Sequence, residues 1–317
     1  MTRENNKYCI VGYGSHAKSK VVPSILNISS EIVGVVSKKK KLDKTFYHFS
    51  NLEEALKKVP KKTIFILCSP PDTHAQQALK ILKKGHNLFI EKPITTNKND
   101  LIKIISLAKQ TNSFFVESFM YQYSNLYEKF LKIYLNKKKI LKEINITFYI
   151  PKIPTKTFRT LNKKYSTILF DMGCYVVSLI NILFDDAKFK LISVENIGIS
   201  KKELFEISVK EIPVKIKAKF GINKDYTNDL NLLLNSKNFF SFKPFFYGRS
   251  GKRLIENSYR SKIKKTKIIE EDSFNNMFSK NNKYWLSSQR SRNKLMLKNL
   301  SSLENLNKQY NSIKNKK

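Results

Sequence analysis

Residues 87–93 read Asn-Leu-Phe-Ile-Glu-Lys-Pro, and this stretch decides the fold. Its first four residues form a mainly apolar run of the length of a buried strand, which Glu91-Lys92-Pro93 ends. Two earlier apolar runs, residues 8–11 and 63–68, lead into Gly12-Tyr13-Gly14-Ser15-His16-Ala17 and Ser69-Pro70-Pro71-Asp72-Thr73-His74. Parallel strands place their carboxyl ends at one edge of a sheet, so the three segments are expected to converge on one cleft.

The first 117 residues alternate strand-like and helix-like segments with short connections, which predicts a parallel sheet with helices on both faces. Ser50 and Glu53 have the spacing of a capping box at the start of the second helix. The expected strands are residues 8–11, 31–36, 63–68, 87–90 and 114–116, and the expected helices are about residues 16–28, 52–59, 73–83 and 99–111. This half is predicted to be a Rossmann-type domain.

From Tyr121 onward the pattern changes to an open sheet with few helices. Strands are expected at residues 144–150, 191–197, 204–209, 214–220, 229–234 and 238–242, the last five as an antiparallel meander followed by a basic loop at 249–267. Helices are expected at about residues 125–136, 168–184 and 290–313, the last with helical spacing of its leucines.

The predicted fold class is therefore α/β. A dinucleotide-binding domain with an N-terminal Rossmann parallel sheet is expected in residues 1–120. A second domain, α/β with a large open and mainly antiparallel sheet, is expected in residues 121–317, and its C-terminal helix is expected to pack back on the body.

The chain is strongly basic, because 60 Lys and Arg against 25 Asp and Glu give a formal net charge of +35 over 317 residues. The cations are spread along the whole sequence, and no nucleic-acid recognition motif accompanies them. Biased codon usage explains this charge without a function, and a selected polyanion-binding surface is the alternative. We expect salt-sensitive sticking to nucleic acid but no specific nucleic-acid partner.

The cysteines and apolar segments indicate the compartment. Cys9, Cys68 and Cys174 stand singly in apolar segments, so a disulfide framework is not expected and a reducing cytoplasm fits best. The polar N-terminus and the interruption of the longest apolar stretch by Asp171 argue against a signal peptide or a membrane segment. No metal is expected, because the four histidines form no ligand spacing with the cysteines: His16, His48, His74 and His86.

Gly12 and Gly14 are the first chemical signal. Glycines directly after a strand permit a tight turn and the close approach of a pyrophosphate to the following helix N-terminus, where Ser15 and His16 stand. The third position of the pattern holds Ala17, and a turn without a ligand is the alternative interpretation.

The end of the second strand indicates which dinucleotide binds. A carboxylate usually holds the ribose hydroxyls there, but residues 37–41 read Ser-Lys-Lys-Lys-Lys and no acidic residue comes before Asp43. The Ser37 hydroxyl and the Lys38 ammonium suit a 2′-phosphate, which favours NADP(H), with NAD(H) as the alternative. A solvated lysine loop is the other interpretation.

An ordered set of motifs resembles the Gfo/Idh/MocA oxidoreductase family, in its glucose-fructose oxidoreductase and dihydrodiol dehydrogenase-like branch. The set is Gly12-x-Gly14, Ser69-Pro70-Pro71-x-x-His74, Glu91-Lys92-Pro93, Glu117-Ser118-Phe119-Met120-Tyr121, Phe158-Arg159 and Asp171-Met172-Gly173-Cys174-Tyr175. The resemblance implies a nicotinamide-dependent oxidoreductase of sugars, polyols or nucleotide sugars. It also implies that residues 121–317 are the substrate or oligomerisation domain, with oligomer contacts through the open sheet. The residues expected at the cofactor are Gly12, Gly14, Ser15, His16, Ser37, Lys38, Ser69, Pro70, His74, Glu91 and Lys92.

The resemblance also implies the acid/base residues. Much of the family has a histidine where this chain has Tyr175, and no histidine follows His86. Hydride transfer from a carbinol carbon requires the hydroxyl proton to leave, and Tyr175 and Lys92 are expected to share that task. The cation of Lys92 near Tyr175 would favour phenolate, and Asp171 is expected to orient either group. Pro93 makes the Lys92–Pro93 bond one that can be cis.

Tyr121, Phe158 and Arg159 are the residues expected on the substrate side. The sequence departs from the family at residues 165–167, where a glycine-rich turn is common, and at Gln122, where an arginine often stands. These departures motivate the alternative function, a catalytically inactive dinucleotide-binding or regulatory protein of the same fold.

Overall fold

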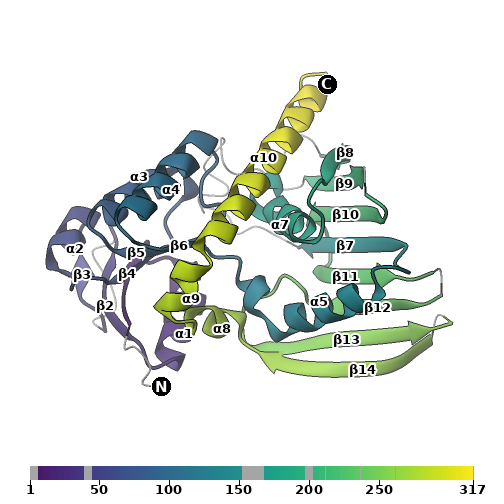
Figure 1. Ribbon diagram of the computed structural model, residues 1–317, viewed down its shortest axis with the longest axis horizontal. Helices are drawn as coiled ribbons and strands as arrows, with labels where there is room; N and C mark the ends of the chain where they lie inside the picture. The colour runs from purple at the N-terminus through teal and green to yellow at the C-terminus, as the bar shows by residue number, and fades with distance from the viewer. Residues whose placement is uncertain are drawn as a thin grey trace. The chain divides into compact units, whose positions relative to one another are not determined.

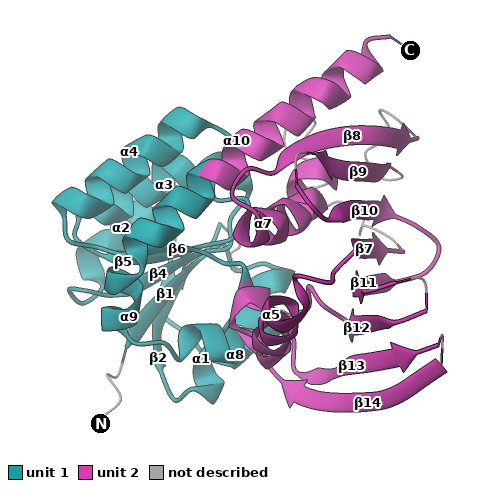
Figure 2. Ribbon diagram, turned by 45° about the vertical axis from the view of Figure 1, so that its right-hand side comes forward, with its two compact units in different colours: residues 1–119, 274–297 teal, residues 120–273, 298–317 magenta. Residues whose placement is uncertain are grey.

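The computed structural model describes residues 6–38, 45–151, 168–196, 203–210, 212–235, 237–260 and 262–316. The chain forms two compact units (Figure 2): unit 1 is residues 1–119 with 274–297, and unit 2 is residues 120–273 with 298–317. Helix α10 (Gln289–Lys314) begins in unit 1 and ends in unit 2. We propose that the two domains predicted from the sequence meet at residue 120.

Unit 1 is built on a six-stranded sheet in the described part of the chain, with the order β3-β2-β1-β4-β5-β6 and parallel pairing throughout. The strands are β1 (Lys7–Val11), β2 (Glu31–Val36), β3 (His48–Phe49), β4 (Ile64–Leu67), β5 (Asn87–Ile90) and β6 (Phe115–Glu117). Every residue of β4 and β5 is buried, as expected for central parallel strands covered on both faces. The sequence misses only the two-residue edge strand β3.

The helices in the first 119 residues follow the predicted positions. These helices are α1 (Val22–Asn27), which follows a π-helical segment η1 (Ala17–Val21), α2 (Leu52–Lys58), α3 (Pro71–Lys83) and α4 (Lys98–Gln110). Side chains cap the N-termini of α2 and α4. The capping box expected from Ser50 and Glu53 is wrong by one residue: the Asn51 side chain accepts from Glu54 N, and Glu54 accepts from Ser50. An asparagine side chain caps the free amides of the first helical turn as well as a serine side chain does. The capping-box spacing therefore fits Asn51 with Glu54 as well as it fits Ser50 with Glu53.

A later segment of the chain returns to unit 1, which the sequence did not predict. Helices α8 (Ser273–Phe278) and α9 (Asn282–Ser287) bring Phe278 and Trp285 against Phe89 of β5, with ring centroids 5.1 and 5.3 Å apart. Trp285 is 1% exposed. The aromatic contacts therefore bury part of the sheet that the preceding helices leave uncovered.

Unit 2 contains an eight-stranded sheet in its described residues, with the order β14-β13-β12-β11-β7-β10-β9-β8. The strands are β7 (Glu143–Ile150), β8 (Lys188–Glu195), β9 (Leu204–Lys210), β10 (Lys215–Ile222), β11 (Thr227–Leu233), β12 (Phe239–Lys243), β13 (Gly251–Tyr259) and β14 (Lys262–Glu271). The expected continuous meander is wrong in one place, because β10 pairs with β7 in parallel, while the remaining pairs are antiparallel. The predicted fold class is confirmed.

The expected basic loop at residues 249–267 is also wrong. This segment forms the antiparallel pair β13 and β14 at one edge of the sheet. Residues 262–268 of β14 are exposed on both faces of the strand. In strands such as β10 and β11, by contrast, every second residue is buried. A strand with two exposed faces has no apolar alternation, so the sequence pattern could not reveal it.

Helices of unit 2 lie on one face of its sheet, where Figure 1 shows α5 (Asn125–Lys137) and α7 (Cys174–Leu183). The predicted helix at residues 168–184 begins as a π-helical segment, η3 (Leu169–Gly173). A β-carbon on Gly173 would lie 2.9 Å from the Phe220 ring, so the absence of a side chain lets η3 pack closely on β10. The opposite face carries charged cross-strand pairs, such as Lys217 with Glu143 at 3.4 Å.

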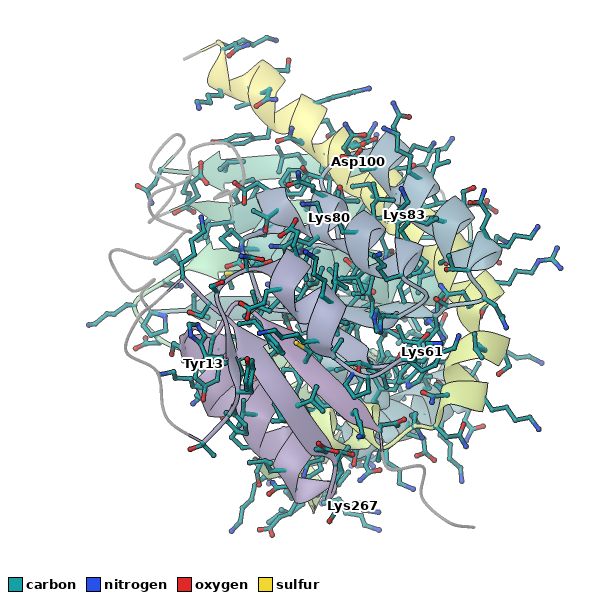
Figure 3. All side chains as sticks on the ribbon, turned by 90° about the vertical axis from the view of Figure 1, so that its left-hand side faces the viewer. Tyr13, Lys61, Lys80, Lys83, Asp100 and Lys267 are labelled. Atoms are coloured by element: carbon teal, nitrogen blue, oxygen red, sulfur yellow. The ribbon has the colours of Figure 1, made fainter. Side chains whose placement is uncertain are left out.

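The surface of unit 1 carries many of the cations. Figure 3 shows Lys61, Lys80 and Lys83 directed outward, and all three are exposed. Some of them form local ion pairs, as Lys80 does with Glu53. Within the part of the chain that the structure describes, no helix combines the length and apolar character needed to cross a membrane.

At Gly12, two backbone segments of unit 1 approach each other closely. Gly12 has a φ of +92°, and a β-carbon there would lie 2.7 Å from Ser69 N and 2.8 Å from the Cys68 carbonyl carbon. Its amide donates to Val36 O at 3.0 Å. Only glycine allows both the left-handed backbone and the close approach of the segments that follow β1 and β4.

We predict that Gly12→Ala lowers the free energy of unfolding of unit 1 by about 2 kcal/mol or more, because backbone strain and a clash add. Gly85→Ala is the matched control: its φ is +71°, but a β-carbon there meets no atom within 4 Å, so we expect a loss of about 1 kcal/mol. Urea unfolding followed by the fluorescence of Trp285, the single tryptophan, reports on unit 1 directly. Equal losses in the two variants would contradict the close-approach explanation.

Candidate functional site

The carboxyl ends of the strands of unit 1 meet in register at one sheet edge. Val11 of β1 stands beside Val36 of β2 and Leu67 of β4, Leu67 stands beside Ile90, and Ile90 stands beside Glu117. The segments that follow these residues therefore begin side by side. They contain most of the residues that the sequence predicts for a site, which the topology of a parallel sheet explains.

The glycine turn after β1 leaves open space at Gly14. An added β-carbon at Gly14 would meet no atom within 4 Å, and Gly14 and Ser15 are exposed. Lys18 N donates to Gly14 O at 3.0 Å, which fixes the start of the helical segment. Ala17, at the third position of the glycine pattern, is fully buried. A negatively charged group can thus approach the helix N-terminus over Gly14.

Ser37 and Lys38 follow β2. The backbone of Ser37 is held on the β3 side, because its amide donates to Phe49 O at 3.3 Å and its carbonyl oxygen lies 2.8 Å from His48 Nε2. Lys38 is exposed. The lysines at positions 39–41 and Asp43 lie outside the described residues.

His74 is completely buried and connects two of the segments at this edge. Its Nε2 lies 2.9 Å from Ser69 O, and its Nδ1 lies 3.1 Å from Pro93 O. Burial lowers the pKa of the His74 imidazole, although both carbonyl oxygens favour the protonated ring. The Ser69 hydroxyl donates to Gln77 at 2.6 Å, and Pro70 is exposed beside it. The His74 ring therefore spans the segments after β4 and β5.

Glu91 and Lys92 follow β5, and the Lys92–Pro93 peptide bond is cis. His16 Nε2 lies 2.9 Å from Glu91 Oε1. Burial raises the pKa of the Glu91 carboxyl, but the charge and hydrogen bond of His16 and the charges of Lys92 and Lys20 outweigh burial and leave the pKa below its usual value. Glu91 is therefore an anion beside the cationic Lys92.

Glu117 is a functional candidate to which the sequence assigned no role. Its Oε1 accepts a hydrogen bond from Ile94 N at 3.0 Å. Burial raises the pKa of the Glu117 carboxyl to about 7, against the hydrogen bond from Ile94 and the charge of Lys92, and the charge of Glu91 adds to the rise. One feature of the sequence could have indicated this residue: Glu117 is a carboxylate at the end of the otherwise apolar strand β6, beside the end of β5.

Tyr175 and Asp171 lie in unit 2. Tyr175 is 7% exposed, its hydroxyl donates to Met120 Sδ at 3.6 Å, and its ring packs against Phe148 and Phe246. Asp171 is half-buried in η3, a π-helical segment of the kind often found at functional sites.

Tyr121 is also in unit 2 and is fully buried. Its hydroxyl donates to Ser178 Oγ at 3.2 Å, so a direct contact with a substrate would have to replace that bond. Phe158 and Arg159 lie outside the described residues. The structure thus brings the predicted residues of unit 1 together and places Tyr175, Asp171 and Tyr121 within unit 2.

Among the described residues, no group of three or more His, Cys, Asp or Glu side chains is placed to hold a metal ion. Cys9, Cys68 and Cys174 form no disulfide bond in the described part of the chain. The edge of unit 1 carries imidazoles, carboxylates, hydroxyls and an amine.

Comparison with known proteins gives similar relatives of modest identity. The chain is 24% identical over 190 residues to trans-1,2-dihydrobenzene-1,2-diol dehydrogenase of Xenopus laevis, which covers 57% of this chain and 56% of the relative. It is 24% identical over 174 residues to dTDP-3,4-didehydro-2,6-dideoxy-alpha-D-glucose 3-reductase of Saccharopolyspora spinosa, covering 52% of each. The chain thus spans about half the length of the curated relatives it matches.

Solved structures show the same fold over nearly the whole chain. A mutant of a 3-ketoreductase from Actinomadura kijaniata, in complex with TDP-benzene and NADP, has a TM-score of 0.79 at 15% identity and covers 96% of this chain and 98% of its own. An aldose-aldose oxidoreductase from Caulobacter crescentus, complexed with glycerol, has a TM-score of 0.76 at 12% identity with 98% coverage of both chains. At these identities the likeness establishes the fold.

The family comparison agrees with the motifs at the edge of unit 1. Residues 6–119 match the family model of Gfo/Idh/MocA proteins, described as an oxidoreductase family with an NAD-binding Rossmann fold. The resemblance that the sequence predicts is therefore confirmed over residues 6–119, which match the model of the Gfo/Idh/MocA oxidoreductase family.

Proposed function

We propose that the protein is an NADP-preferring oxidoreductase that moves a hydride between the nicotinamide and a carbinol or carbonyl carbon of a sugar, polyol or nucleotide sugar. The observation that carries this proposal is at the edge of unit 1. The segment after β1 has open space over Gly14, and the segment after β5 carries Lys92. The two segments meet where His16 Nε2 lies 2.9 Å from Glu91 Oε1. The match of residues 6–119 to the model of an oxidoreductase family supports the proposal.

The residues after β1 and β2 fit the cofactor. Gly14 and Ser15 would hold the pyrophosphate at the helix N-terminus, because the backbone there is exposed and a β-carbon on Gly14 would meet nothing. The Ser37 hydroxyl and the Lys38 ammonium would hold a 2′-phosphate. The bound cofactor supplies the hydride or receives it. Ser69, Pro70, His16 and Glu91 complete the expected cofactor contacts.

Lys92 and Tyr175 are proposed to handle the proton at the substrate oxygen. An ammonium at Lys92 can donate a hydrogen bond to a carbonyl or alkoxide oxygen, and the Tyr175 hydroxyl can give or take the proton. Asp171 is proposed to orient Tyr175 or Lys92. We assign His74 a positioning role in the same site, because its ring holds Pro93 O next to Lys92 and has no exposed surface.

The substrate class is proposed from two relatives, one named for a cyclic diol and one for a dTDP-linked sugar. Both names describe a ring carbon that carries a hydroxyl or a carbonyl group. Tyr121, Phe158 and Arg159 remain the proposed substrate residues. Assembly of copies through the sheet of unit 2 also remains a proposal.

We predict that Lys92→Met and Tyr175→Phe each lower kcat by roughly 100-fold or more, because each removes a proton-transferring group. The assay measures oxidation of NADPH, or reduction of NADP, with a panel of aldoses, ketoses, polyols and nucleotide sugars. Lys61→Met is the matched control, since Lys61 is an exposed lysine of unit 1. Activity within twofold of wild type in both variants would contradict the assignment. Tight NADPH binding by the wild type without turnover of any substrate would favour the inactive binding protein instead.

We predict that Ser37→Asp lowers the preference for NADP over NAD by roughly tenfold or more, because a new carboxylate repels the 2′-phosphate and accepts hydrogen bonds from ribose hydroxyls. Calorimetric titration with each dinucleotide gives the ratio of the two dissociation constants. Ser19→Asp, at an exposed position of η1, controls for the added negative charge. An unchanged ratio in Ser37→Asp would refute the part assigned to Ser37.

A further inference from the structure

Glu117 occupies an unusual place for a carboxylate. It is the last residue of β6, directly beside Ile90 at the end of β5. The two preceding residues of β6, Phe115 and Val116, have no exposed surface. Glu117 itself is half-buried, and a charge that is partly removed from water is stabilised by hydrogen-bond and charge partners.

The Glu117 carboxylate holds the backbone just beyond Lys92. Its Oε1 accepts from Ile94 N at 3.0 Å, while His74 Nδ1 lies 3.1 Å from Pro93 O. Two side chains, one from β6 and one from α3, therefore bind adjacent residues of this segment. Fixing Pro93 and Ile94 also fixes the backbone from which the Lys92 side chain departs.

Three charged groups act together here. Glu117 is influenced by the cation of Lys92 and by the anion of Glu91, and Glu91 is in turn held by His16, Lys92 and Lys20. The pKa of Glu91 lies below its usual value, so Glu91 stays ionised at neutral pH. The pKa of Glu117 is raised by burial to about 7, so its charge changes in the physiological range.

We propose that Glu117 is a positioning residue for Lys92, which holds the Lys92–Pro93–Ile94 backbone and balances the charge of the lysine. Above neutral pH the charge of the ionised Glu117 acts on the Lys92 cation together with the charge of Glu91, and below neutral pH Glu117 is uncharged and its contribution is lost. The catalytic consequence rests on the proposed function, whereas the coupling between Glu117 and Lys92 does not depend on turnover.

The coupling can be measured by infrared difference spectroscopy of the full chain labelled with ¹³C-glutamate, recorded between pH 5 and 9. The carbonyl stretch of a protonated buried carboxyl group is expected to disappear with a midpoint of about 7, and to be missing in Glu117→Gln. In Lys92→Met the midpoint is expected to rise, because the cation that lowers the Glu117 pKa is gone. In Glu91→Gln it is expected to fall, because a neighbouring anion is gone. Glu53→Gln, at an exposed carboxylate, is expected to leave it unchanged.

The stability of the fold gives a second readout with a definite sign. A carboxyl group whose pKa is raised on folding stabilises the protein below its unfolded pKa and loses that contribution as pH rises through the folded value. The urea midpoint of the wild type, relative to that of Glu117→Gln, is therefore expected to fall between pH 5 and pH 8. A constant difference, or a Glu117 midpoint that does not move in Lys92→Met, would overturn the proposal.

Kinetics separate the charge of Glu117 from its hydrogen bond. Glu117→Gln keeps an oxygen that can accept from Ile94 N and loses the charge. An inflection of kcat near pH 7 is therefore expected in the wild type and is expected to be absent from Glu117→Gln. Glu117→Leu loses both, and a fall in kcat of roughly tenfold or more is expected with NADPH affinity retained. An inflection that persists in Glu117→Gln would also overturn the proposal. A protein without turnover, but with the infrared midpoint shifted in Lys92→Met, would refute the proposed function and leave the positioning role supported.

Discussion

The close approach of two backbone segments at Gly12 is the constraint on which unit 1 depends. No β-carbon fits between the turn after β1 and the Cys68–Ser69 backbone after β4, where the gap would be 2.7 Å. This contact brings the glycine turn beside Ser69, and His74 then carries the connection on to Pro93. Two residues further along the turn, Gly14 faces open space. Gly12 thus allows the close approach of the two segments, and Gly14 leaves the space over the turn open.

The electrostatics of this edge follow from the same arrangement. Parallel strands that end in register place Glu91, Lys92 and Glu117 on neighbouring segments, and the helix after β1 supplies His16. The two carboxyl groups respond in opposite directions, because cations surround Glu91 while burial dominates at Glu117. Pairs of carboxyl groups whose pKa values are pushed apart are a feature of sites that move protons.

The sequence predicted those parts of the fold that rest on local patterns. Apolar strands that end in glycine, proline and charged residues predicted the Rossmann sheet, and the motifs predicted the family that residues 6–119 resemble. The sequence failed where the information lies in distant contacts: β14 is exposed on both faces, and Trp285 returns to β5 from nearly two hundred residues away. The partners of Glu117 depend on the register between β5 and β6, and those of His74 on a bond across nineteen residues. No pattern in a single sequence fixes either.

We propose that unit 1 binds a nicotinamide dinucleotide with its pyrophosphate over Gly14. Calorimetric titration of NADPH into wild type and Gly14→Val tests this binding. A side chain at Gly14 meets no protein atom, so the variant is expected to melt at the temperature of the wild type and to bind NADPH at least about 100-fold more weakly. Equal affinity in the two proteins, or no binding by the wild type, would contradict the account.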